Sequence, residues 1–112
     1  MRLNEIKDSL DLKVLTGNGQ LESEVNRGYV SDLMSDVIAH GNEGDIWITY
    51  QAHVNVVAIA LMKNMAGVIL IQGRELIPAA AEKAEKEGLP VMVSEGSAFE
   101  VVGKLYQMGI PG

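Results

Sequence analysis

From residue 46 to the end of the chain, short apolar runs typical of strands alternate with segments typical of helices. This alternation constrains the fold more than any other feature. The strand-like runs are residues 46–50, 68–71 and 90–93, and helix-like segments follow at residues 54–65, at 78–87 and from Ser97 onward. Strands connected through helices are normally parallel, with right-handed crossovers. The order therefore predicts a three-layer α/β/α sandwich with a mainly parallel sheet of about four to five strands.

The N-terminal part adds further elements. Apolar spacing predicts a short helix over the first ten residues and a strand at residues 12–16, which ends at Gly17. Residues 20–29 show no clear period, so we predict a loop with a short extended piece near Val25. A helix over residues 30–40, with Gly41 as a left-handed cap, is predicted from the helical spacing of Val30, Leu33, Met34, Val37 and Ile38.

The chain composition limits the classes of function. The 112 residues fit a single domain, residues 1–112, and the apolar fraction of 47% is typical of a globular protein. A net charge of −6 disfavours binding to nucleic acid or to an anionic membrane. No stretch reads as a signal peptide or a membrane span, so we expect a cytoplasmic location.

Sequence motifs that indicate catalysis or a cofactor are missing. The chain has no cysteine, no GxxxxGK[ST] phosphate loop, no GxSxG and no HExxH, and Glu22 stands where a dinucleotide fingerprint requires glycine. Asp32 and Asp36 lie four residues apart, and a solvated helix face explains them better than a shared cation. We therefore predict no catalytic residue, no metal site and no cofactor.

Polar and small residues follow each predicted strand. Because ligands bind beyond the carboxyl ends of parallel strands, these residues form the candidate ligand site. They are Thr16, Gly17, Thr49, Gln51, His53, Gly73, Arg74, Ser94 and Ser97. Arg74 is the one cation of the set, and its guanidinium suits a phosphate or carboxylate. The alternative is that these are ordinary polar turns, with Arg74 paired to a surface acid such as Glu75.

Several longer strings resemble the DRTGG-domain family. They are GYVSDLMSDV (28–37), GDIWIT (44–49), HVNVVA (53–58), VILIQGR (68–74) and the segment from Leu89 to Leu105, so the resemblance runs from about residue 12 to the end. It implies an α/β sandwich that serves as an accessory or regulatory module, often at a dimer interface. Such domains are similar to the N-terminal domain of HPr kinase/phosphorylase, and they occur in some phosphate acetyltransferases and between the CBS domains of some pyrophosphatases.

One position departs from the family pattern, which ends in Thr-Gly-Gly. The corresponding residues here are Ile71-Gln72-Gly73, followed by Arg74. The chemistry at position 72 therefore differs from that of relatives, and any ligand site of the family at this turn does not carry over directly.

Three hypotheses follow for function. The first is a non-catalytic regulatory or protein-interaction module that forms a homodimer, because the 54–65 helix is apolar on more faces than one sheet can cover. The second is a sensor that binds an adenine nucleotide or another phosphorylated metabolite at the strand ends. The third is an enzyme that uses His53 as an acid or base, for which the sequence shows no partner group.

Overall fold

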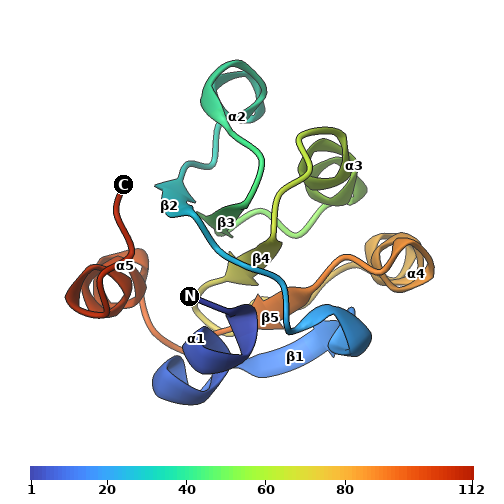
Figure 1. The fold of residues 1–112 in the computed structure, drawn as a ribbon. Coiled ribbons are helices and arrows are strands. Elements are labelled where there is room, and N and C mark those ends of the chain that lie inside the picture. Colours follow the sequence, from blue (N-terminus) through green and yellow to red (C-terminus); the bar gives the residue numbers. More distant parts are fainter.

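The computed structural model describes residues 1–112 and places a five-stranded sheet between two layers of helices (Figure 1). The order of strands across the sheet is β1-β5-β4-β3-β2. Their bounds are β1 (Lys13–Thr16), β2 (Arg27–Val30), β3 (Asp45–Thr49), β4 (Gly67–Leu70) and β5 (Val91–Val93). The predicted three-layer sandwich is confirmed.

The helices divide between the two faces of the sheet (Figure 1). Helices α1 (Leu3–Leu10) and α5 (Ala98–Gln107) cover one face, and α2 (Met34–His40), α3 (Val54–Met62) and α4 (Pro78–Glu87) cover the other. Because side chains alternate along a strand, β3 supplies Ile46 and Ile48 to the first core and Trp47 to the second. A short 3₁₀ turn, η1 (Asn18–Gln20), follows β1.

Strand β1 runs opposite to its neighbour. Strands β2, β3, β4 and β5 are mutually parallel, whereas β1 pairs antiparallel with β5 and carries a bulge between Val14 and Thr16. Antiparallel pairing is open to β1 because its neighbour β5 is distant in sequence, so no crossover helix sets its direction. The prediction that Thr16 would end at the same edge as the other strands is therefore wrong.

The region from residue 27 to residue 41 also differs from the prediction. Residues Arg27–Val30 form strand β2 rather than a loop, because they pair in parallel register with β3. Helix α2 starts only at Met34 and buries Val37, while Leu33 is 63% exposed. Gly41 has a φ of −67° and is extended, so the predicted left-handed cap is wrong. Pairing with a buried neighbouring strand outweighed the local helical spacing.

Helix α3 lies between α2 and α4 (Figure 1). It buries Val56, Val57, Ile59 and Ala60, while Met62 is 59% exposed. Helices α2 and α4 thus pack against the sides of α3 that we had expected a second subunit to cover. Helix α3 therefore gives no reason to expect a dimer. None of the helices has the length and apolar character needed to span a bilayer.

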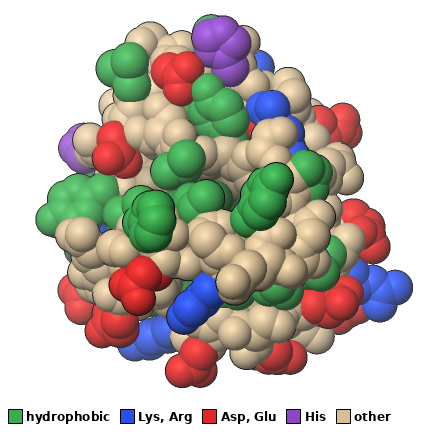
Figure 2. Space-filling view, turned by 90° about the vertical axis from the view of Figure 1, so that its left-hand side faces the viewer, with side chains coloured by type: hydrophobic (Ala, Val, Ile, Leu, Met, Phe, Trp, Pro, Cys, Tyr) green, Lys and Arg blue, Asp and Glu red, His purple; other side chains and the backbone are tan.

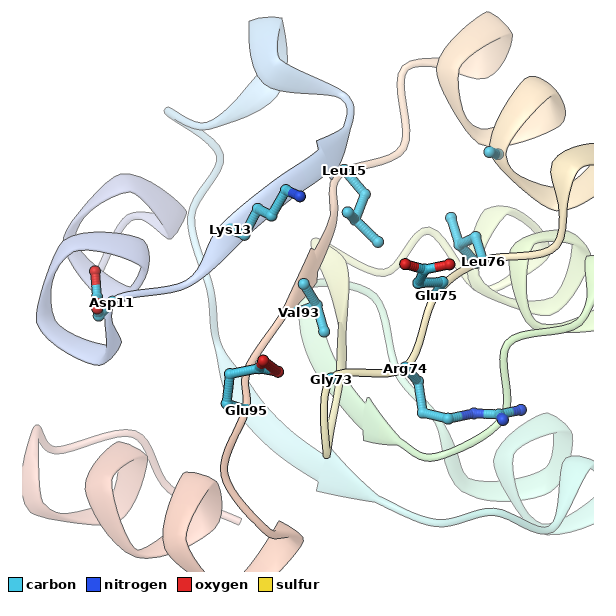
Figure 3. Close-up of a pocket in the computed structure, with 10 residues that line it drawn as sticks. Asp11, Lys13, Leu15, Gly73, Arg74, Glu75, Leu76, Val93 and Glu95 are labelled. Carbon is cyan, nitrogen blue, oxygen red and sulfur yellow. The ribbon is translucent and has the colours of Figure 1, made fainter.

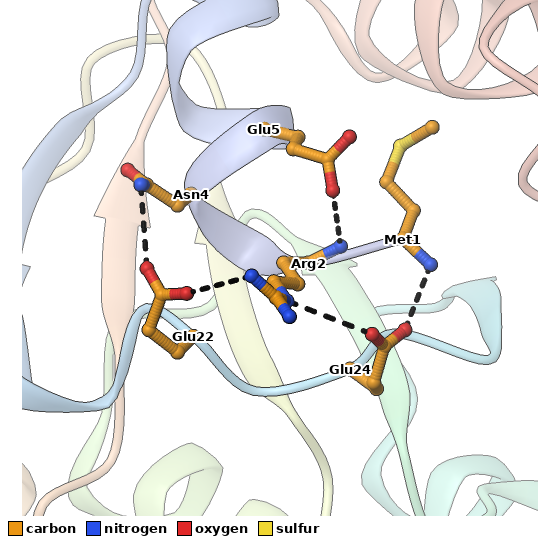
Figure 4. Close-up of polar contacts among 6 residues, drawn as sticks. All are labelled: Met1, Arg2, Asn4, Glu5, Glu22 and Glu24. Carbon is orange, nitrogen blue, oxygen red and sulfur yellow. Dashed lines mark hydrogen bonds and ion pairs between the residues drawn. The ribbon is translucent and has the colours of Figure 1, made fainter.

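The first residues are tied to the segment before β2 (Figure 4). Arg2 forms a β-bridge with Glu24, the amino group of Met1 lies 2.9 Å from Glu24 Oε2, and Arg2 Nη1 lies 3.1 Å from Glu22 Oε2. The Met1 ammonium lowers the pKa of Glu24. Exposed ion pairs contribute little stability. The docking of α1 therefore depends mainly on its buried residues, Leu3, Ile6 and Leu10.

Candidate ligand site at the carboxyl edge of the sheet

The end of β3 is held by Asp32. Asp32 Oδ1 accepts hydrogen bonds from Thr49 Oγ1 at 2.7 Å and from the Tyr50 backbone N–H at 2.8 Å. Thr49 Oγ1 also accepts from the Gln51 N–H at 3.2 Å. Asp32 thus orders the loop between β3 and α3, whereas Asp36 bonds to Tyr29 and His40. Nowhere do three or more histidine or acidic side chains gather closely enough to hold a metal ion.

The end of β4 is a tight turn at Ile71–Arg74. The Arg74 N–H donates to the Ile71 carbonyl at 3.2 Å, and both central residues have positive φ, 54° at Gln72 and 65° at Gly73. These features define a type I′ turn. The Gln72 N–H donates to the Gly96 carbonyl and the Gly73 N–H to the Ser94 carbonyl, each at 2.9 Å. Because protein oxygens already occupy these N–H groups, the turn does not offer them to a phosphate.

We predict that Gln72→Gly stabilises the protein by about 0.5–1 kcal/mol. A residue with a side chain is strained at positive φ, whereas glycine is not. Glycine also raises the entropy of the unfolded chain, which offsets part of the gain in stability. Urea denaturation would measure the difference. A Gln72→Ala variant is the control, since alanine keeps the strain, and it should show no gain. A loss of stability in Gln72→Gly would show that the Gln72 side chain contributes more than its backbone strain costs.

The two serines that follow β5 accept hydrogen bonds from backbone N–H groups. Ser94 Oγ accepts from the Gly96 N–H at 3.0 Å. Ser97 Oγ accepts from the Glu100 N–H at 3.2 Å, and the Glu100 carboxylate accepts from the Ser97 N–H, so the two residues form a capping box at the start of α5, where a helix was predicted. Both hydroxyls are partly engaged in holding the β5–α5 connection.

Arg74 lies on the ring of Tyr50. Its guanidinium carbon is 4.4 Å from the ring centroid, and Nε donates to the Tyr50 carbonyl at 3.2 Å. Arg74 takes part in none of the ion pairs of the structure, so the alternative of a surface pair between Arg74 and Glu75 is wrong. Stacking and one hydrogen bond leave the terminal nitrogens free to meet an anion.

A trough of about 500 Å³ lies beside Gly73, between β1 and α4 (Figure 3). Its apolar residues are Leu15, Leu76, Ala81 and Val93, and its charged residues are Asp11, Lys13, Arg74, Glu75 and Glu95. A side chain at Gly73 would collide with the carboxylate of Glu95. In Figure 3 the Arg74 guanidinium points away from Glu95 and Lys13. The acidic residues of the trough therefore make its interior a poor place for a phosphate.

The structure separates the predicted site into two groups. Thr49, Gln51, His53, Gly73, Arg74, Ser94 and Ser97 lie at or just beyond the carboxyl edge of the parallel strands. Thr16 and Gly17 lie at the other edge, where Thr16 Oγ1 donates to the Leu89 carbonyl at 2.8 Å and the Gly17 N–H donates to Glu85 Oε2 at 3.1 Å. These two residues join β1 to the α4–β5 connection and do not contribute to a shared pocket.

His53 occupies the N-cap position of α3. Its side chain is exposed, makes no cap hydrogen bond and takes part in none of the ion pairs of the structure. The sequence analysis did not place Asp32, Tyr50 or Glu95 among the candidate ligand residues, and it interpreted Asp32 as part of a solvated helix face. Tyr50 carried a usable signal, because it ends a strand-like run, whereas the helical reading of residues 30–40 concealed the role of Asp32.

The shifted pKa values lie mostly away from this edge, around β2 and α2. Tyr29 donates its hydroxyl to Asp36 Oδ2 at 2.8 Å, and His40 Nδ1 lies 3.0 Å from Asp36 Oδ1. The hydrogen bond from Tyr29 lowers the pKa of Asp36, with smaller contributions from Ser31 and His40, and the same bond raises the pKa of Tyr29. The cluster is a hydrogen-bonded contact at the surface.

We predict that Tyr29→Phe moves acid unfolding to higher pH. Because the folded protein lowers the pKa of Asp36, this group contributes stability above its unfolded pKa, and the contribution is lost as pH falls through the folded pKa. Removing the hydroxyl removes the main cause of the shift. Acid titration followed by circular dichroism would measure the midpoint. Tyr106→Phe, at an exposed position without this bond, should leave the midpoint unchanged.

The fold is that of a small α/β domain with a mainly parallel five-stranded sheet. The DRTGG domain model matches residues 5–108, and the chain belongs to the DRTGG domain family. The predicted family resemblance is thereby confirmed. No curated protein matches the chain.

A solved structure shares this fold. It is the crystal structure of the CBS and DRTGG domains of the regulatory region of Clostridium perfringens pyrophosphatase, complexed with its activator, diadenosine tetraphosphate. The TM-score is 0.78 at 18% sequence identity, and the match covers 98% of this chain and 47% of that chain. The present chain thus spans about half of the length of the structure it resembles. At this identity the likeness establishes the fold.

Proposed function

We propose that this chain is a regulatory module without a catalytic site of its own, which acts as a homodimer. The observation that carries the proposal is an exposed apolar patch on α5 and β2. Phe99 is 90% exposed, Tyr106 73% and Val30 52%. Figure 2 views this side of the molecule, and hydrophobic side chains gather in a band across its middle.

Exposed apolar patches of this kind usually mark interaction surfaces. A shallow groove continues the face and is lined mainly by apolar residues of β2, β3, α5 and the C-terminal tail, including Ile48, Val102 and Ile110. Aromatic residues concentrate in the centres of interfaces, where charged residues are scarce. A regulatory role fits the solved relative, whose DRTGG domain belongs to the regulatory region of an enzyme.

Light scattering coupled to size exclusion tests the dimer. A mass near twice 12.1 kDa is expected at tens of micromolar protein. Phe99→Ser should shift the equilibrium to monomer. Met62→Ser is the matched control, because Met62 is also an exposed apolar residue but lies on α3, on the other face of the sheet. A monomeric wild-type chain at these concentrations would refute the dimer.

A second candidate function is supported by one observation, the stacking of Arg74 on Tyr50 with no acid partner. This arrangement suits a phosphorylated ligand, such as an adenine nucleotide, at the carboxyl edge of the sheet. The solved relative is complexed with a dinucleotide activator, although its chain contains CBS domains as well.

Thermal shift measurements test the sensor. A ligand at 100 times its dissociation constant stabilises the folded state by about 2.7 kcal/mol, which is easily detected. We expect a raised Tm with a nucleotide or sugar phosphate, and no response in Arg74→Gln. Lys86→Gln, at an exposed position on α4, is the control and should respond as wild type does. If none of these compounds raises the Tm at millimolar concentration, this function is excluded.

A further inference from the structure

The short turn η1, which follows β1, contains the one asparagine of the chain that precedes a glycine. Asn18 and Gly19 are its first two residues, and every other asparagine precedes a residue with a side chain. This order matters because the backbone nitrogen of the following residue can attack the side-chain carbonyl of asparagine. A Cβ on the following residue hinders that approach, and glycine has none.

Both groups that would react are open to solvent and free of hydrogen bonds. Asn18 and Gly19 are exposed. The Asn18 amide takes part in none of the side-chain hydrogen bonds near this turn, which are made by Thr16 and by the Gly17 N–H. The Gly19 N–H donates to no backbone carbonyl. A Cβ built on Gly19 would meet no atom within 4 Å, so nothing packs over the site.

The folded backbone restrains this attack only weakly. The backbone at Asn18 must leave its helical conformation before the Gly19 nitrogen can reach the side-chain carbon. One hydrogen bond closes η1, from the Gln20 N–H to the Gly17 carbonyl at 2.9 Å. An intramolecular hydrogen bond adds so little net stability that the need to open it slows the reaction by about tenfold at most. Local opening of an exposed single turn is also more frequent than global unfolding.

We propose that Asn18 is a site of spontaneous deamidation. The Gly19 nitrogen loses its proton to hydroxide and forms a bond to Asn18 Cγ, and the side-chain nitrogen leaves as ammonia after it takes a proton from water. The product is a succinimide ring. Water then opens the ring: cleavage of the bond to Cγ gives aspartate, and cleavage of the bond to the backbone carbonyl carbon gives isoaspartate. The net reaction consumes one water, releases one ammonia and needs no oxidant or enzyme.

The modification changes both the charge and the backbone of η1. Either product adds a negative charge to a chain whose net charge is already −6. Isoaspartate also adds a methylene group to the main chain between Gly17 and Gly19. Gly17 cannot move to absorb it, because its Cα packs so closely on the backbone of Leu89 and Pro90 that a Cβ there would lie 2.5 Å from them. The exposed side of η1 therefore takes up the added length.

Incubation of the folded protein at mildly alkaline pH, followed by tryptic digestion and mass spectrometry, tests the proposal. The tryptic peptide of residues 14–27 contains Asn18 and Asn26, so Asn26 is an internal control, and a sample digested without incubation gives the baseline. We expect Asn18 alone to gain the mass of an amide-to-acid conversion, at a rate that rises with pH, and the product to be a substrate for an isoaspartate-specific methyltransferase.

Gly19→Ala is the matched variant, because open space at Gly19 accommodates a methyl group. The variant should convert about tenfold more slowly or less, since the Cβ hinders the attacking nitrogen. Equal conversion of Asn18 in Gly19→Ala and in the wild type would overturn ring closure through the Gly19 nitrogen. Conversion of Asn18 in urea-unfolded protein but not in folded protein would show that η1 protects the site, and would also overturn the proposal.

Discussion

Arg27→Ala is expected to lower the free energy of unfolding by about 3–5 kcal/mol, the cost of removing one partner from a buried ion pair. Arg27 holds Asp45 through two hydrogen bonds, Nε to Oδ1 at 2.8 Å and Nη2 to Oδ2 at 3.0 Å, and Nη2 also donates to the His40 carbonyl at 2.7 Å. Asp45 is fully buried. Without the guanidinium, its carboxylate keeps only the Asn42 N–H as a hydrogen-bond donor.

The Asp45 carboxylate also raises the pKa of Arg27, chiefly through their hydrogen bond, so the guanidinium stays charged throughout the accessible pH range. Guanidinium chloride denaturation would measure the loss. Arg2→Ala is the matched control: the ion pair of Arg2 with Glu22 is exposed on both sides, and its loss should cost at most about 1 kcal/mol. Adding Asp45→Asn to Arg27→Ala should recover part of the stability, because the buried charge is gone. Equal losses of stability in Arg27→Ala and Arg2→Ala would contradict the conclusion that the ion pair with buried Asp45 matters more than an exposed one.

Gly17→Ala is expected to cost about 3–5 kcal/mol. The φ of Gly17 is +71°, a region that costs a residue with a side chain about 1–3 kcal/mol. A Cβ there would also lie 2.5 Å from the backbone atoms Leu89 C and Pro90 N, which can move only by displacing the start of β5. Overpacking of this kind adds about 1–3 kcal/mol.

Gly19→Ala provides the control for this effect, since Gly19 lies two residues away with open space around its Cα. Its substitution should change stability by no more than about 0.5 kcal/mol. Chemical denaturation of both variants would measure the difference. A Gly17→Ala variant as stable as Gly19→Ala would mean that the β1–β5 contact yields easily, which would contradict the tight packing seen here. We interpret Gly17 as a packing residue that was placed among the ligand candidates only by its position after a strand.

Local signals predicted most elements correctly. The capping box at Ser97, Pro78 at the first position of α4 and the apolar run before Gly73 each gave the expected element, because each depends on residues close in sequence. Strand β2 was missed, since Arg27–Val30 is a strand only through its pairing with β3. The helix expected at residues 30–40 was shortened for the same reason.

The candidate site likewise has a part that the sequence predicted and a part that depends on contacts between distant residues. Residues at the ends of the parallel strands gathered at one edge, as the alternation of strands and helices predicted. The turn at Gln72 and Gly73 could not be judged from sequence, because whether its N–H groups are free depends on carbonyls more than twenty residues away, in Ser94 and Gly96. The stacking of Arg74 on Tyr50 likewise joins two loops whose distance no local pattern encodes.

By itself, the amino-acid sequence determined the layers of this protein: the periods of its apolar residues made helices and strands, and their alternation made β3, β4 and β5 parallel. Only the tertiary structure decided the direction of β1, the existence of β2 and the opposite location of Thr16. These features depend on pairing between segments far apart in the chain, where hydrogen bonds and burial outweigh local preference. Periodicity reports which side of an element is apolar, and it contains no information about the neighbour that will cover that side.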